Sequence, residues 1–359
     1  MKRPAVFAVG AVVLGILLAV GIWYTRQREA GIAGLANPYR LSRTDERRLL
    51  RYFGDASRHN AYQITAATLA HWMAIHKPMV IIDVRQPFGS DGFVQGHVPG
   101  AHNIPIQDFG LELTATHAYS AKEGTYFSDG SRVVPATVQF FPLPHNEPII
   151  VMCYDGMGGE MTPALLRVLG YQAYGLRWGL SSWSPALNVW KPAADINPYP
   201  VAVGEAKAPA AAPLTGNDQL GAALAAQVAP IYQALNHAYP AGYGRPWTID
   251  AATLELSLNS ETPPQVIDLR SPAAYARGHI PGSVNIPFAD LGRDIDAVSR
   301  QGTVVLASAT LQRAAQACLV LRLLGIRAYV LQRGLSTWNP EFSPPPPVTA
   351  HYPVATGSL

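Results

Sequence analysis

Cysteine is scarce in this chain, which has only Cys153 and Cys318 among its 359 residues. Two cysteines do not make a disulfide framework, and no Cys/His spacing resembles a zinc site. The formal net charge is only +3, and no run of lysine and arginine is suited to nucleic acid. These absences exclude a disulfide-stapled scaffold, a structural zinc module and a nucleic-acid partner.

An internal repeat is the main positive feature. Ile81–Pro105 and Val266–Pro287 are related copies, and Leu169–Trp183 and Leu324–Trp338 form a second related pair further along. A repeat of this kind indicates one fold used twice, and a chain of 359 residues is long enough for two domains. The first copy is longer after Pro105, which indicates a surface insertion over residues 106–148.

Short apolar runs predict the strands of each copy. Val80–Val84 and Ile149–Met152 in the first copy correspond to Val266–Leu269 and Val304–Ala307 in the second. Such runs alternate with helical segments, which is typical of buried parallel strands. The predicted fold class is therefore α/β, with each copy a parallel sheet flanked by helices.

The N-terminus carries an uncharged apolar run, Ala5–Tyr24. About 20 residues in a helix span the roughly 30 Å hydrocarbon core of a bilayer, and Trp23 lies where an interfacial aromatic is common. A cleaved signal peptide is the alternative, but it should be shorter and followed closely by small residues. Charged Thr25–Glu29 follows here, so the sequence favours one uncleaved transmembrane helix.

Charges on both sides of the run bear on its orientation. Lys2 and Arg3 precede it and favour a cytoplasmic N-terminus, with the domains on the periplasmic side of the cell inner membrane. Arg26, Arg28 and later arginines favour the opposite orientation under the same rule. We expect a membrane-anchored protein with periplasmic domains, and the cytoplasmic face stays open as the alternative.

Composition divides the chain into six parts. Residues after the anchor are rich in arginine and are expected to be helical around Thr44–Phe53, Ala206–Gly216 resembles a Pro/Ala linker, and Asn217–Tyr239 predicts an amphipathic helix. The expected parts are the anchor or signal (1–24), a stalk (25–58), the first domain (59–200), the linker and helix (201–245), the second domain (246–342) and a Pro-rich tail (343–359).

An ordered set of motifs occurs in both copies. In the first copy it consists of Asp83-Val84-Arg85, Gly96–Ala101, Asn103-Ile104-Pro105, Gly179-Leu180 and Trp183. In the second it consists of Asp268-Leu269-Arg270, Gly278–Ser283, Asn285-Ile286-Pro287, Gly334-Leu335 and Trp338. This set resembles the rhodanese family, including its tandem sulfurtransferases, over roughly residues 60–190 and 247–340. The resemblance implies two rhodanese-like domains in which the Asp, Gly-His and Trp positions mostly hold the fold.

In that family, a loop between a central strand and a helix carries a Cys-x-x-x-x-Arg pattern or a close relative. Its cysteine takes a sulfane sulfur from a donor and holds it as a persulfide. In the family's loop, backbone N–H groups at a helix N-terminus stabilise an anion, an arrangement that lowers the thiol pKa and receives an anionic donor. The resemblance places Cys153 at the catalytic position. The implied substrate-binding residues are Tyr154, Asp155, Gly156, Met157, Gly158, Gly159 and Arg85.

The first loop lacks the basic residues that are often seen in the family. Gly158 stands in place of the closing arginine, and Asp155 and Glu160 are expected to oppose a thiolate or a bound anion. Thiosulfate is therefore expected to be a poor donor. Arg177 and Trp178 are further candidates for substrate contact.

The second loop differs in the opposite sense. Counting back from the shared Leu-Gly pair places Ser308 opposite Cys153, and Arg313 falls where the first loop has glycine. A serine alone cannot carry persulfide chemistry, so the second domain is expected to be inactive. Cys318 lies further on in an apolar helical segment and is expected to be a core thiol.

Two functions stay open at this point. The first is a membrane-anchored sulfurtransferase in which Cys153 moves sulfur from a small donor to a thiol or other nucleophile, with no metal or organic cofactor implied. The second is a non-catalytic, membrane-tethered rhodanese-like module. It would bind a protein partner through the pocket at the family's catalytic position or through the insertion at 106–148. Cys153 favours the enzyme, whereas the acidic loop and the aromatic residues of the insertion favour the binding module.

Overall fold

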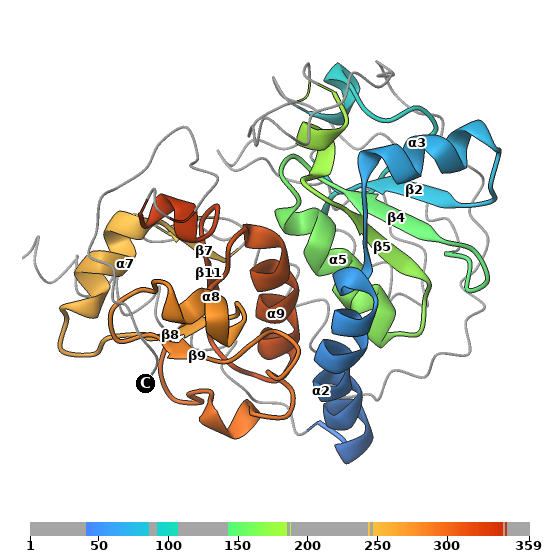
Figure 1. Cartoon of the computed structure of the whole chain (residues 1–359). Helices are drawn as coiled ribbons and strands as arrows, with labels where there is room; N and C mark the ends of the chain where they lie inside the picture. Colours follow the sequence, from blue (N-terminus) through green and yellow to red (C-terminus); the bar gives the residue numbers. More distant parts are fainter. Residues whose placement is uncertain are drawn as a thin grey trace, which may run out of the picture. The chain divides into compact units, whose positions relative to one another are not determined.

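The computed structural model describes residues 41–85, 92–106, 143–184, 187, 243–244, 247–339 and 342 (Figure 1). The apolar run at 5–24, the linker and expected helix at 206–239, the tail at 343–359 and most of the insertion at 106–148 lie outside these residues. The chain divides into two units, residues 1–38 and 39–359, and both copies of the repeat belong to the second unit. No helix within the described ranges is long and apolar enough to cross a membrane.

The first domain is built on a five-stranded sheet. The strand order is β1-β5-β4-β2-β3, and every neighbouring pair is parallel. Its strands are β1 (Gln63–Ile64), β2 (Val80–Asp83), β3 (His102–Asn103), β4 (Ile149–Met152) and β5 (Ala173–Leu176). The central strand β4 is buried along its whole length, as its unbroken apolar run predicts.

The second domain repeats this sheet and adds one strand. The order is β6-β7-β11-β10-β8-β9, in which β6 pairs antiparallel with β7 and the other pairs are parallel. The strands are β6 (Tyr243–Gly244), β7 (Thr248–Ile249), β8 (Gln265–Asp268), β9 (Val284–Asn285), β10 (Val304–Ala307) and β11 (Ala328–Leu331). The prediction of two parallel sheets flanked by helices is confirmed.

Equivalent helices begin at equivalent caps. The side chain of Thr65 accepts the N–H of Thr68 at 3.1 Å, and that of Asp250 accepts the N–H of Thr253 at 2.7 Å. The helices that follow these caps, and one further short helix, are α3 (Ala66–Ala74), α7 (Ala251–Leu258) and α8 (Pro272–Ala276). Short 3-10 helices include η1 (Asn60–Tyr62), η2 (Phe93–Gln95), η3 (Gly179–Ser182), η7 (Ile295–Ala297) and η8 (Leu335–Thr337).

Two equivalent helices join the domains. Helices α5 (Met157–Val168) and α9 (Leu311–Leu323) each follow the loop after the central strand of their own sheet, and they pack against one another (Figure 1). Nearly every residue of both helices is buried. A helix buried all round needs partners on all sides, and here these are its own sheet and the other helix. The two domains therefore form one packed unit.

Repeated motifs hold the strand ends in place. The Arg85 guanidinium donates to the Asp83 carboxylate at 2.7–3.0 Å and also to the Gly96 carbonyl, and both charged side chains are buried. Asp268 and Arg270 form the same pair in the second domain. This geometry agrees with the expectation that these motif positions hold the fold.

The helix expected in the stalk runs over Arg43–Arg58 as α2, and it packs against α5 and α9. The Phe53 ring meets Phe288 edge-on, with ring centroids 5.6 Å apart. The Tyr52 hydroxyl donates to Oε1 of Gln316 at 2.9 Å. This part of the expected stalk therefore belongs to the folded unit and contacts both domains.

Candidate functional site

Cys153 begins the loop that connects β4 to α5. It directly follows the last residue of the buried strand, and the helix starts at Met157. Gly156 has a φ of +103°, in the left-handed region that favours glycine. A Cβ there would also lie 3.4 Å from the Gln312 side chain of the second domain. The sharp turn places Cys153 beside the N-terminal end of the helix.

The repeated Gly-Leu motif holds the carbonyl groups of this loop. The N–H of Leu180 donates to the Cys153 carbonyl at 2.8 Å, and the N–H of Ser181 donates to the Tyr154 carbonyl at 3.0 Å. Gly179 has a φ of +56°, and a Cβ on it would collide with the Cys153 carbonyl oxygen. The motif therefore recurs because only glycine allows this close approach to the loop.

The Cys153 thiol is buried, with 6% of the residue exposed. Its Sγ accepts the N–H of Gly159 at 3.3 Å. Burial, with the negative charge of Asp155, raises the pKa of Cys153 to about 12, although the N–H groups of Gly159 and Gly156 act to lower it. Loss of water and a nearby carboxylate outweigh the two amide groups, in contrast to the lowered thiol pKa that the family's loop implies. Both burial and Asp155 therefore favour the protonated thiol.

A cavity of about 260 Å³ lies between the domains and opens onto Cys153. The first domain lines it with Val84, Arg85, Ile106, Cys153, Tyr154, Asp155, Met157 and Gly158. The second domain lines it with Thr248, Leu311, Gln332 and Arg333. All the expected site residues except Gly156 and Gly159 thus meet at one cavity, whose size suits a small ligand. Within the described part of the chain, no group of His, Cys, Asp and Glu is placed to hold a metal ion.

The second domain brings a positive charge to this cavity through Arg333. This residue follows β11 in a left-handed turn with a φ of +60°, and Trp178 takes the equivalent position in the first domain with +66°. Burial raises the pKa of the Asp155 carboxyl, and the charge of Arg333 acts to lower it. Comparison of the two copies does not identify Arg333, because it acts on the loop of the other copy and not on its own.

The three sequence candidates for substrate contact fall in different places. Arg85 lines the cavity, but its guanidinium is bonded to Asp83 and lies 5.3 Å from the ring centroid of Tyr154. The equivalent pair in the second domain shows that this interaction is first a structural one. Arg177 is exposed and Trp178 is buried, and neither lines the cavity.

Glu160, which was expected to oppose the thiolate, lies outside the cavity. Its carboxylate is fully buried and accepts Nε2 of Gln63 at 2.9 Å and Nε2 of Gln316 at 2.5 Å. Burial raises the pKa of Glu160 well above its usual range, and the two amide donors lower it less. Gln316 also bonds the Tyr52 hydroxyl and the Ala61 carbonyl. This buried network links α2 to both domains, so Glu160 acts on their packing and not on the thiol.

The loop of the second domain has a local arrangement. Ser308 directly follows β10 and is buried, and its hydroxyl donates to the Thr310 carbonyl within the same loop. Arg313 is exposed on α9. Cys318 is fully buried in α9, as expected for a core thiol, and its Sγ donates to the Ala328 carbonyl at 3.3 Å.

Comparison with known proteins yields one family. A family model described as a rhodanese-like domain matches residues 65–186 and 251–341, more than half of the chain. No curated protein matches the chain.

Similar solved structures include a rhodanese-related protein from Thermoplasma volcanium, which is 27% identical, with 30% of this chain and 96% of that chain covered and a TM-score of 0.26. A rhodanese-like domain protein from Staphylococcus aureus is 24% identical, with 26% and 90% covered and a TM-score of 0.25. A thiosulfate sulfurtransferase from Pseudomonas aeruginosa is 19% identical, with 86% and 49% covered and a TM-score of 0.28. Because these TM-scores are low, the family rests on the match of the family model alone.

Proposed function

This chain belongs to the rhodanese-like family, and we propose that its first domain is a sulfurtransferase in which Cys153 carries the transferred sulfur. The observation that supports this most is the setting of the thiol. Cys153 starts the loop between the central strand and a buried helix, lines a cavity, and accepts the N–H of Gly159 at 3.3 Å. Amide groups at a helix N-terminus suit a sulfur that becomes anionic during the reaction.

The proposed reaction has two balanced steps. The Cys153 sulfur attacks the outer sulfur of a donor R–S–S⁻, the donor S–S bond breaks, and the departing sulfur takes the thiol proton as R–SH. Cys153 is left as a persulfide anion. An acceptor thiol then takes the terminal sulfur, and Cys153 regains its proton. Neither step changes the net oxidation state, so the transfer needs no redox cofactor.

The charges around the cavity select the donor. Asp155 opposes additional negative charge beside Cys153, and Arg333 supplies a cation from the second domain. Gly158 takes the place where the family's loop pattern has its closing arginine. A singly charged persulfide therefore suits this site better than doubly charged thiosulfate, which we expect to be a poor donor.

The second domain is proposed to complete the site without chemistry of its own. Four of its residues line the cavity, and its helix α9 covers α5. Ser308 stands at the position of the cysteine, with its hydroxyl bonded to its own loop. A serine oxygen has no route to a persulfide.

A membrane tether is proposed from the sequence alone. The apolar run Ala5–Tyr24 has the length of a transmembrane helix, and Lys2 and Arg3 before it favour periplasmic domains. Full-length protein should then resist carbonate extraction, and alkaline phosphatase fused after Leu359 should be active. A mature N-terminus near Asn37 would instead establish a cleaved signal.

The raised pKa of Cys153 favours a second candidate, a non-catalytic module that binds a protein partner through this cavity. A thiol with a pKa of about 12 is almost entirely protonated at neutral pH and is a weak nucleophile. In that case the cavity would recognise a partner without forming a persulfide.

Sulfur transfer from a persulfide donor to cyanide or a thiol separates the two candidates. The full-length enzyme should catalyse it, Cys153→Ser should abolish it, and Cys318→Ser should retain it as the matched control. Equal rates in wild type and Cys153→Ser would contradict the enzyme. Complete inactivity of the wild type with every donor would favour the binding module.

A further inference from the structure

One face of α2 gathers arginine side chains. Arg51 lies four residues after Arg47 and three after Arg48, so it shares a side of the helix with each of them, and all three are exposed. Leu49 and Phe53 are fully buried. Apolar packing therefore already holds α2 in place, and the arginine face is not needed for that purpose.

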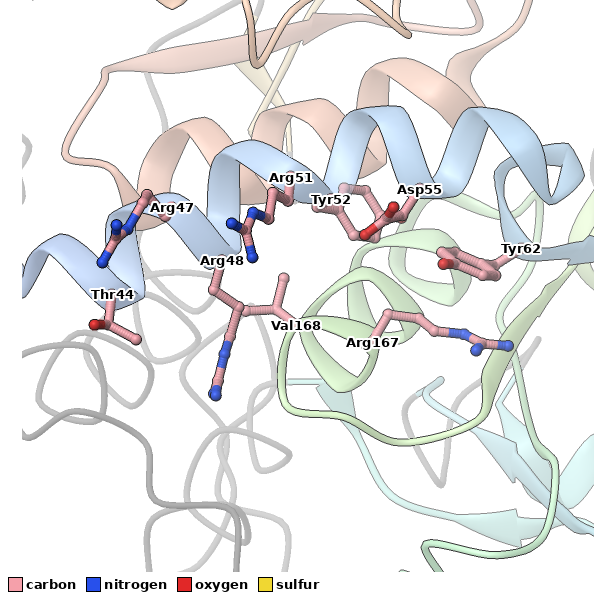
Figure 2. A pocket seen from close by; sticks show the side chains of 9 residues that line it. All are labelled: Thr44, Arg47, Arg48, Arg51, Tyr52, Asp55, Tyr62, Arg167 and Val168. Atoms are coloured by element: carbon pink, nitrogen blue, oxygen red, sulfur yellow. The ribbon is translucent and has the colours of Figure 1, made fainter.

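This face lines a cavity of about 510 Å³ beside the end of α5 (Figure 2). Arg167, the penultimate residue of α5, and Tyr62 of η1 line the cavity together with the α2 arginines. Its volume lies in the range of small-molecule sites. No described residue lines both this cavity and the one at Cys153, so the two are treated as separate sites.

The Arg167 guanidinium is held in a fixed place. It lies 3.9 Å from the ring centroid of Tyr62 and 4.5 Å from that of Tyr174, and its Nε donates to the Ala173 carbonyl at 2.6 Å. Its buried Nη2 has no hydrogen-bond partner among the described residues. Arg322 has a comparable aromatic clamp in the second domain, so the clamp belongs to the fold. Arg167 lines the cavity beside the α2 arginines, and Figure 2 shows its guanidinium pointing towards Tyr62.

Positive charge predominates among the described residues that line this cavity. Arg48, Arg51 and Arg167 line it, and Asp55, the only carboxylate among the described lining residues, is already paired with Arg58. Arg48 and Arg51 are like charges one helical turn apart, an arrangement that destabilises a helix. The cavity therefore attracts an anion, and binding one would relieve this repulsion.

We propose that this cavity binds a phosphate-bearing anion. Guanidinium groups make paired hydrogen bonds to phosphate oxygens, and the exposed Arg48 and Arg51 side chains suit a ligand with more than one negative charge. The headgroup of an anionic phospholipid and a soluble polyphosphate offer the same chemistry. Binding here is independent of sulfur transfer at Cys153, since the two cavities share no described residue.

Inorganic pyrophosphate is the probe, and calorimetry measures its binding to the full-length protein in uncharged detergent. The wild type should bind it saturably, with an affinity that falls as salt rises. The double substitution Arg48→Gln with Arg51→Gln should weaken binding by about tenfold or more. Arg277→Gln removes the same kind of charge from an exposed position at the end of α8 that lines no part of this cavity, so it should bind like the wild type. Glutamine keeps the helix propensity of arginine.

Anionic phospholipid added to the detergent separates the two sources of phosphate. A lipid headgroup as the ligand would displace pyrophosphate from the wild type, whereas a soluble ligand would leave pyrophosphate binding unchanged, and either result supports the site. The proposal is overturned if the wild type binds neither pyrophosphate nor anionic phospholipid. It is also overturned if Arg277→Gln loses as much affinity as the double variant.

Discussion

The loop between β4 and α5 and the loop between β10 and α9 have the same backbone hydrogen bond at their start. They differ in what their first side chain contacts. In both, the leucine of the Gly-Leu motif donates its N–H to the first loop carbonyl, at 2.8 Å for Cys153 and 2.9 Å for Ser308. Cys153 faces a cavity that the other domain completes, whereas the Ser308 hydroxyl turns back to its own loop. The backbone hydrogen bond that holds the loop is thus present in both copies. The proposed chemistry depends on the side chain at the start of the loop and on the residues that line the cavity beside it.

The backbone arrangement of the two loops can be tested at the equivalent glycines of the Gly-Leu motif, Gly179 and Gly334. Gly179→Ala should lower the free energy of unfolding by about 3 kcal/mol, because a Cβ at this left-handed position collides with the Cys153 carbonyl. At Gly334 the nearest atoms, which include the Ser308 carbonyl oxygen, lie 2.9 Å from an added Cβ. Gly334→Ala should therefore lower the free energy of unfolding by less. Denaturant unfolding measures both variants. A Gly179→Ala protein as stable as the wild type would contradict this backbone arrangement.

The buried network between the domains can be tested by substituting Glu160. Its folded pKa is raised by burial, so its contribution to stability is fully present below the unfolded pKa near 4.3 and is lost as pH rises through the folded pKa. Glu160→Gln removes this loss and should raise the free energy of unfolding by about 2 kcal/mol at pH 8.

Unfolding curves recorded at pH 5 and pH 8 measure this effect. The gain from Glu160→Gln should shrink towards pH 5, because burial raises the pKa of Glu160 and its carboxyl takes up a proton as the pH falls. A gain that is equal at both pH values would show that the pKa of Glu160 is not raised.

The contribution of the second domain to the proposed site can be tested at two arginines. Arg333→Gln should raise the KM for an anionic persulfide donor about tenfold, because it removes a cation from the cavity. Arg313→Gln serves as the control, since this exposed arginine lines no part of that cavity. Steady-state kinetics measure both, and equal effects of the two substitutions would remove Arg333 from the proposed site.

The charge next to the thiol gives the smallest expected effect. Asp155→Asn removes a negative charge that raises the pKa of Cys153, so the thiol should ionise more readily. At pH 8, alkylation of Cys153 by iodoacetamide should become about threefold to tenfold faster in a Cys318→Ser background. The alkylation profile should also shift to lower pH. A shift to higher pH would mean that Asp155 assists ionisation.

Much of the fold could be predicted because central parallel strands are buried on both faces. Their sequences are therefore unbroken apolar runs, and Ile149–Met152 and Val304–Ala307 have the same bounds in the sequence and in the structure. The edge strands β1 and β3 have two residues each, which is too short to produce such a signal.

The candidate site could be predicted only in part. The motif located Cys153 and its loop, because these residues are consecutive in the chain. Arg333 was missed because it reaches the cavity from the other copy, a contact that no local pattern contains. Glu160 was misassigned because its place near the start of a helix does not tell whether its side chain faces the loop or α9. The loop sequence reveals the amide groups and the carboxylate near the thiol but not the loss of water, which is the largest cause of its raised pKa.

The most direct test of the central claim is the intact mass of the full-length protein after incubation with a persulfide donor. The wild type should gain the mass of one sulfur atom, peptide mapping should locate it on Cys153, and a thiol acceptor should remove it. Cys153→Ser should gain nothing, since the only other cysteine, Cys318, is buried in α9. No added sulfur in the wild type, or sulfur found on Cys318, would contradict the proposal that Cys153 carries the transferred atom.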